Sequence, residues 1–263
     1  MIDRTLDAAG IDARQWRALV RTYITLDFRA PGGAVRAHRP QPKGVAPLVG
    51  LAFITGVGGI AFAFIAFFSD DVLLGASLLT TYAAANTMML LLVDFTGVVI
   101  SPDDYGVLGH RPVASRTYFA ARMAAVAVYV GTISLVIAVP AAIVYGVRLN
   151  VLAAPATVLA VLLCDLTTAV LVIMGYVLLL RWVHPGRLRR AMSYLQLAVS
   201  GSFYATYYLA TIGFRRTAAA SIGFGDVGWL WAVPSTWFAA FVPVAGGQGS
   251  GASWVATVDA PDP

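Results

Sequence analysis

Residues 151–180 have the sequence VLAAPATVLAVLLCDLTTAVLVIMGYVLLL, in which the only charged side chain is Asp165. A helix rises about 1.5 Å per residue, so roughly 20 apolar residues cross the hydrocarbon core of a bilayer. This stretch exceeds that length. It therefore predicts a membrane-spanning helix with a carboxyl group near its middle.

Further apolar stretches of the same kind occur on both sides of it. Lipid offers the backbone no hydrogen bonds, so each stretch must form a helix to cross. A weaker candidate, 228–247, contains two prolines and three tryptophans, which favours an interfacial or re-entrant segment. We predict an all-α polytopic membrane helix bundle with about five transmembrane helices, or six if 228–247 also crosses. The five predicted spans are 46–68, 72–100, 117–145, 151–180 and 191–214.

The overall composition agrees with a membrane protein. Hydrophobic residues make up 59% of the chain and charged residues 12%, and the mean hydropathy is +0.77. An average soluble domain is about 25% charged. The basic excess is almost entirely arginine placed between apolar stretches, which orients a protein in a membrane and does not indicate a nucleic-acid partner.

The distribution of basic residues predicts the orientation. Most of them precede the first span, separate spans two and three, or follow span four, which are all on one side. The other side receives only Arg148, Arg215 and Arg216. The positive-inside rule therefore places the N-terminus in the cytoplasm, with the chain in a bacterial inner membrane.

The N-terminal region, 1–45, predicts an amphipathic helix followed by a linker. Apolar residues recur at helical spacing on one face, and Asp12 can cap the helix start. We expect this helix to lie along the cytoplasmic membrane surface, with its arginines meeting anionic headgroups. The apolar residues are Trp16, Leu19, Val20, Tyr23 and Ile24, and the arginines on another face are Arg14, Arg17 and Arg21.

The segment SPDDYGVLGHRP, 101–112, joins spans two and three on the predicted cytoplasmic side. Its serine, proline and two aspartates are typical of a helix start, and Gly109 and Pro112 favour a stop. We predict a short helix of about two turns, with an ordinary membrane loop as the alternative. The chain then divides into 1–45, a transmembrane bundle at 46–214 with this loop at 101–116, and an extracytoplasmic interfacial segment and polar tail at 215–263.

The stretch SPDDYGVLGHRPVASRTYFAARM, 101–123, resembles the permease subunit of bacterial ATP-binding cassette exporters of the ABC-2-like class. In that family a short cytoplasmic helix between spans two and three docks on the ATPase subunit. The later stretch WAVPSTWFAAF, 231–241, is similar to the apolar extracellular segment of such permeases. The resemblance assigns ATPase coupling to Pro102, Asp103, Asp104, Tyr105, Leu108, Arg111 and Pro112.

The function that this resemblance implies is a permease subunit that couples ATP hydrolysis by a separate ATPase to movement of a substrate across the inner membrane. The chain has no phosphate-binding loop, so ATP would be bound by the partner and this chain would bind no cofactor and act as no enzyme. The implied assembly is a homo- or heterodimer of permease chains. Because the sequence ends in a polar tail, it could be the N-terminal half of a longer permease.

A candidate translocation path comes from the polar residues inside the spans. An ionised carboxylate at the centre of a helix costs roughly 2.5–3.5 kcal/mol on insertion scales, so Asp165 is a functional candidate; the alternative is a protonated carboxyl group that is hydrogen-bonded to a neighbouring helix. An alternative function that depends on Asp165 is a proton-coupled secondary transporter. A further alternative is a non-transporting anchor or assembly protein. Span five contributes a polar stripe that could equally serve interhelical hydrogen bonding: Gln196, Ser200, Tyr204, Tyr207 and Thr211.

Overall fold

The structure is a computed structural model that describes residues 11–29, 46–69, 71–98, 114–182 and 232–247, together with the helical residues Tyr194, Leu197 and Gly201. Every regular element within these residues is a helix. The predicted all-α helix bundle is therefore confirmed.

The first four predicted spans each correspond to one long helix. The fifth, 191–214, lies outside the described residues except for the three helical positions named above, and it stays a prediction. The described helices are α2 (Ala13–Arg29), α3 (Ala46–Phe68), α4 (Val72–Val98), α6 (Ser115–Arg148), α7 (Ala153–Trp182), α9 (Pro234–Ala239) and α10 (Phe241–Ala245).

Three helices, α4, α6 and α7, each contain a stretch that is long and apolar enough to cross a membrane. Helix α3 adds a shorter apolar stretch, Ala52–Phe68. The surface supports this assignment, because large apolar side chains such as Phe53, Ile54 and Phe68 are 70–74% exposed. Exposed apolar surface on this scale is suited to lipid and not to water. The chain is a membrane protein with transmembrane helices.

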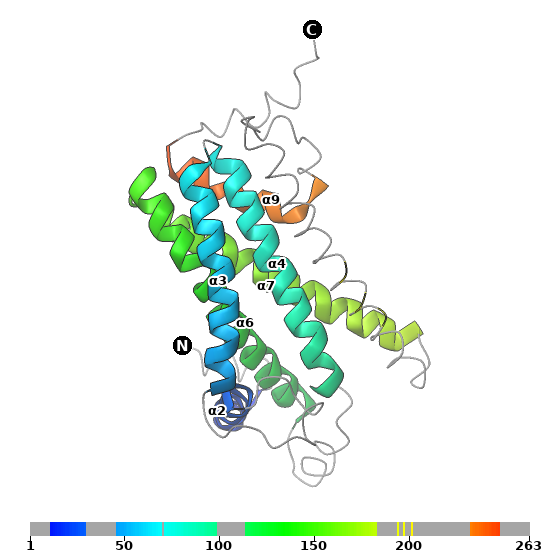
Figure 1. Cartoon of the computed structure of the whole chain (residues 1–263). Helices are drawn as coiled ribbons and strands as arrows, with labels where there is room; N and C mark the ends of the chain where they lie inside the picture. Colours follow the sequence, from blue (N-terminus) through cyan, green and yellow to red (C-terminus); the bar gives the residue numbers. More distant parts are fainter. Residues whose placement is uncertain are drawn as a thin grey trace.

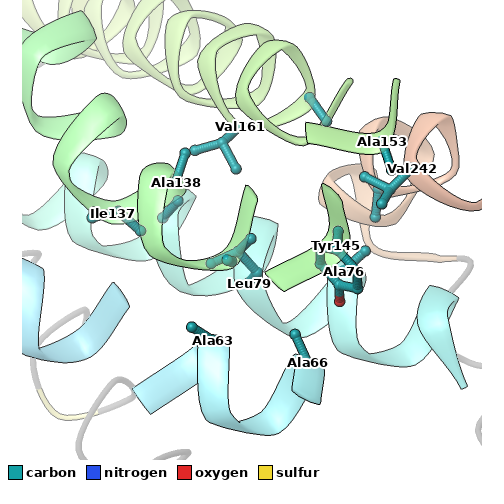
Figure 2. Close-up of a cluster of buried hydrophobic side chains, with 14 of the residues drawn as sticks. Ala63, Ala66, Ala76, Leu79, Ile137, Ala138, Tyr145, Ala153, Val161 and Val242 are labelled. Atoms are coloured by element: carbon teal, nitrogen blue, oxygen red, sulfur yellow. The ribbon is translucent and has the colours of Figure 1, made fainter. Parts of the chain in front are cut away.

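Helix α6 is the central element of the bundle. It packs against α3 and α7, while α4 packs against α7. Helix α2 lies at the end of the bundle where α4 ends and α6 begins, and α9 lies at the opposite end (Figure 1). The core between the long helices is built largely from alanines, with a few larger side chains such as Leu79, Ile137 and Tyr145 (Figure 2). Small residues allow close helix packing, which drives association where lipid removes the hydrophobic effect.

Two polar side chains between α6 and α7 organise the end of the bundle that carries α9. The Arg148 guanidinium donates to the carbonyl oxygens of Ala66 (2.5 Å) and Ser69 (2.9 Å), where α3 ends. The Asn150 side-chain oxygen accepts the first backbone N–H groups of α7, and its amide donates to the Ala245 carbonyl. Arg148, an exception in the predicted charge distribution, thus caps a neighbouring helix.

The stretch predicted as an interfacial or re-entrant segment forms α9 and α10. These helices have six and five residues, so each is less than about 10 Å long and does not cross a bilayer. Helix α9 is attached to α4 by polar contacts: Thr80 donates to the Ser235 carbonyl (3.0 Å), and the Thr81 and Ser235 hydroxyls are 2.7 Å apart. Among residues 232–247, no sixth span is present; their extracytoplasmic location stays a prediction.

Helix α2 begins as predicted, because the Asp12 carboxylate accepts the backbone N–H groups of Arg14 (2.9 Å) and Gln15 (3.0 Å). Its apolar stripe packs on α6 around Tyr118, Ala121 and Ala125. The helix is therefore held to the bundle by contacts within the chain. Its place on the cytoplasmic membrane surface stays a prediction.

Helices α3 and α6 approach each other closely at Gly59. A Cβ atom at this position would lie 2.7 Å from the Ile137 carbonyl oxygen and 3.0 Å from the Ile137 Cα. Both atoms belong to backbone inside a helix, so neither can move aside without displacing the helix. Only glycine fits here.

We predict that Gly59→Ala separates α3 from α6 and lowers the stability of the bundle by about 1–3 kcal/mol, the usual effect of overpacking. Thermal unfolding of the purified protein in detergent measures it. Gly175→Ala is the matched control, since a Cβ at Gly175 in α7 meets no atom within 4 Å. Equal melting temperatures for the two variants would contradict the close contact.

Candidate functional site

Three polar side chains from three different long helices meet in the core of the bundle. They are Thr87 of α4, Ser134 of α6 and Asp165 of α7, and each is at most 1% exposed. We call them the polar layer. Asp165 was predicted as a functional candidate, and the structure places it in this layer.

Apolar residues close the polar layer on both sides. The residues four positions away in either direction along α4, α6 and α7 are all buried and apolar. On one side these residues are Ala83, Ala138 and Val161, and on the other Leu91, Val130 and Ala169, each set belonging to a single hydrophobic cluster. In this conformation the carboxyl group is therefore shielded from both ends of the bundle.

The hydrogen bonds of Ser134 indicate the protonation state of the layer. Its hydroxyl oxygen lies 2.5 Å from Asp165 Oδ2 and 2.9 Å from the Val130 carbonyl oxygen. A hydroxyl has one hydrogen and can donate to only one of them. Both contacts can be hydrogen bonds only if Asp165 is neutral. The protonated carboxyl group then donates to the Ser134 hydroxyl, and the Ser134 hydroxyl donates to the Val130 carbonyl oxygen. This arrangement also avoids an unpaired charge in the membrane.

The second carboxyl oxygen is unused. Asp165 Oδ1 and the Thr87 hydroxyl are both buried and have no hydrogen-bond partner among the described residues, although Thr87 is near enough to interact with the carboxyl group. A buried donor or acceptor without a partner costs about 1–3 kcal/mol. Thr87 can donate and Oδ1 can accept, so a bridging water or a small approach of α4 to α7 would satisfy both.

No basic side chain is available to pair with Asp165 in the described part of the chain. The described arginines of α6 and α7 lie in the first turns of α6 or at the C-terminal ends of the two helices: Arg116, Arg122, Arg148 and Arg181. The layer therefore works with hydroxyl groups alone. Such a group of side chains can hold a proton and can join three helices, and within the described residues no cluster of metal ligands occurs.

The other predicted site residues lie outside the described residues, and their predictions stand untested. They comprise the predicted coupling residues Pro102, Asp103, Asp104, Tyr105, Leu108, Arg111 and Pro112, and the predicted stripe of Gln196, Ser200, Tyr204, Tyr207 and Thr211.

Ser134 and Thr87 were not identified from the sequence. Both lie in apolar helices where many threonines and serines bond only to their own helix, as Thr132 and Thr157 do. Spacing within one helix does not show which hydroxyl meets a residue of another. Cys164 is buried, with its sulfur 3.8 Å from the Thr80 carbonyl oxygen.

We predict that Ser134→Ala lowers the stability of the protein by about 1–3 kcal/mol, because it leaves the buried Asp165 hydrogen without an acceptor. Thr132→Ala on the same helix is the control, since its hydroxyl bonds only to the Val128 carbonyl (2.8 Å). Thermal unfolding in detergent compares the two.

Asp165→Asn completes this test, because an amide N–H can donate to Ser134 as the neutral carboxyl does. It should lower stability less than Ser134→Ala. If it lowers stability more, the layer depends on a negative charge and the neutral assignment is wrong.

Comparisons with protein-family models, curated proteins and solved structures found no match to this chain. Its functional assignment therefore depends on its own residues: the apolar exterior, the arrangement of α2, α4 and α6, and the polar layer.

Proposed function

We propose that this chain is the membrane-spanning permease subunit of an ATP-binding cassette exporter. The supporting observation is the arrangement at one end of the bundle. Helix α4 ends at Val98, α6 begins at Ser115, and α2 packs on the first turns of α6 (Figure 1). The predicted coupling segment, 101–112, joins α4 to α6, so a force on it would act directly on two long helices.

The packing supplies a route for that force. Helix α6 contacts α2, α3 and α7, and the Ser134–Asp165 hydrogen bond joins it to α7 in the core. Closure of an ATPase would displace 101–112 and tilt α6, and α7 would follow through the polar layer. The apolar residues on one side of the polar layer would then separate while those on the other side stay packed, which opens a path to one end of the bundle or the other.

The proposal includes partners and orientation. Without a phosphate-binding loop, this chain takes its energy from a separate ATPase that binds ATP, and a second permease chain, identical or different, completes the path. The arginine-rich end, with α2, faces the cytoplasm of a bacterial inner membrane. Helices α9 and α10 then face the outside.

We predict that Tyr105→Ala weakens binding of the cognate ATPase at least about tenfold, since truncating an aromatic interface anchor typically costs about 2 kcal/mol or more. Leu108→Pro should abolish stimulation of ATP hydrolysis by breaking the predicted short helix. Co-purification and permease-stimulated ATPase activity are the measurements.

Phe241→Ala serves as the control, because Phe241 is 58% exposed and lies in α10, next to α9 at the end of the bundle opposite α2. If Tyr105→Ala and Leu108→Pro bind and stimulate the ATPase as the wild type does, the coupling role is lost and with it the main support for the exporter.

A second candidate function is a proton-coupled secondary transporter. The observation that favours it is the polar layer, in which a buried carboxyl group is bonded to Ser134 and retains an unused oxygen facing Thr87. A group of this kind can gain and lose a proton as the bundle opens to each side.

Asp165→Asn separates the two candidates, because the amide cannot exchange a proton. In an ATP-driven exporter, transport in proteoliposomes containing the ATPase should remain within about twofold of the wild type. In a proton-coupled carrier, flux driven by a pH gradient should disappear while the protein stays folded. Loss of ATP-driven transport in a folded Asp165→Asn variant would contradict the exporter proposal.

A further inference from the structure

The face of α2 that points away from the bundle carries three exposed arginines, Arg14, Arg17 and Arg21. They recur at i, i+3 and i+7, so they share one side of the helix. The opposite side is occupied, because Trp16, Tyr23 and their apolar neighbours pack on α6. This packing occupies the apolar stripe of α2, while the three arginines stay exposed.

One exposed arginine of α6, Arg116, extends this positive surface. The Asp12 backbone N–H donates to the Thr117 hydroxyl (3.4 Å), which places the start of α2 on the first turn of α6, beside Arg116. On the packed side of α2, the Arg122 guanidinium lies 5.1 Å from the centre of the Tyr23 ring and joins the two helices.

The length of α6 fixes the depth of this corner. Its 34 residues extend about 50 Å, whereas the hydrocarbon core is about 30 Å thick and the whole bilayer about 40–45 Å. The first turns of α6 therefore lie at headgroup level when its middle is in the membrane. Phe119, next to these turns, is 58% exposed and offers a contact for an acyl chain.

We propose that the corner of α2 and α6 that carries the exposed Arg14, Arg17, Arg21 and Arg116 binds the phosphodiester headgroup of an anionic phospholipid. Guanidinium groups bind phosphate oxygens in bidentate pairs, and a headgroup-level site beside exposed apolar surface fits a lipid better than a free anion. The bound lipid holds α2 against the membrane and so fixes the foot of α6. The site is independent of what the protein transports.

The test compares the wild type with the triple variant Arg14→Gln, Arg17→Gln, Arg21→Gln in nanodiscs of phosphatidylcholine with and without about one third phosphatidylglycerol. The wild type should melt at a higher temperature with phosphatidylglycerol, and the effect should fade at high salt. The triple variant should lose most of this rise. Arg181→Gln, which removes an exposed arginine from the C-terminal end of α7, should keep it.

Two further measurements keep the outcome specific. In uncharged detergent without lipid, the triple variant should melt as the wild type does, which shows that α2 still packs on α6. Inorganic phosphate should not replace phosphatidylglycerol. Equal stabilisation of wild type and triple variant by phosphatidylglycerol would overturn the site, and so would loss of ATPase binding by the triple variant with its lipid response intact.

Discussion

The absence of hydrogen-bonding partners in lipid is the constraint on which this structure depends. It requires every polar group within the membrane to find a partner inside the protein. The exterior of α3, α6 and α7 is accordingly apolar, and serines and threonines lie inside, mostly bonded to carbonyls of their own helices. A carboxyl group at Asp165 is tolerated because it shares a hydrogen bond with the buried Ser134 hydroxyl. The same bond joins the central helix α6 to α7, so satisfying one buried group also determines how two helices meet.

The sequence predicted the long helices well, because the length of an apolar stretch is set by the membrane thickness. The predicted span 46–68 has the same bounds as α3, and 151–180 differs from α7 by two residues at each end because Asn150 caps the helix start. The cap at Asp12 was also predictable from local chemistry. The polar layer was not, since contacts between Thr87, Ser134 and Asp165 depend on the rotation of three helices. The packing of α2 on α6 was missed for the same reason.

The two proposed functions use the same core in different ways. For an ATP-driven permease, the polar layer is a joint that transmits a displacement of α6 to α7. For a proton-coupled carrier, it is the place where the driving ion binds. The contact at Gly59 belongs to neither, because it holds α3 close against the backbone of α6.

The attachment of α9 and α10 has a consequence for biosynthesis. Their contacts lie on α4, through Thr80 and Thr81, and on the turn between α6 and α7, through Asn150. All of these partners leave the ribosome before Ser235 does, and they must be integrated and assembled before α9 can dock. The partners of α9 and α10 are thus synthesised before these helices are, so their docking follows the synthesis of α4, α6 and α7.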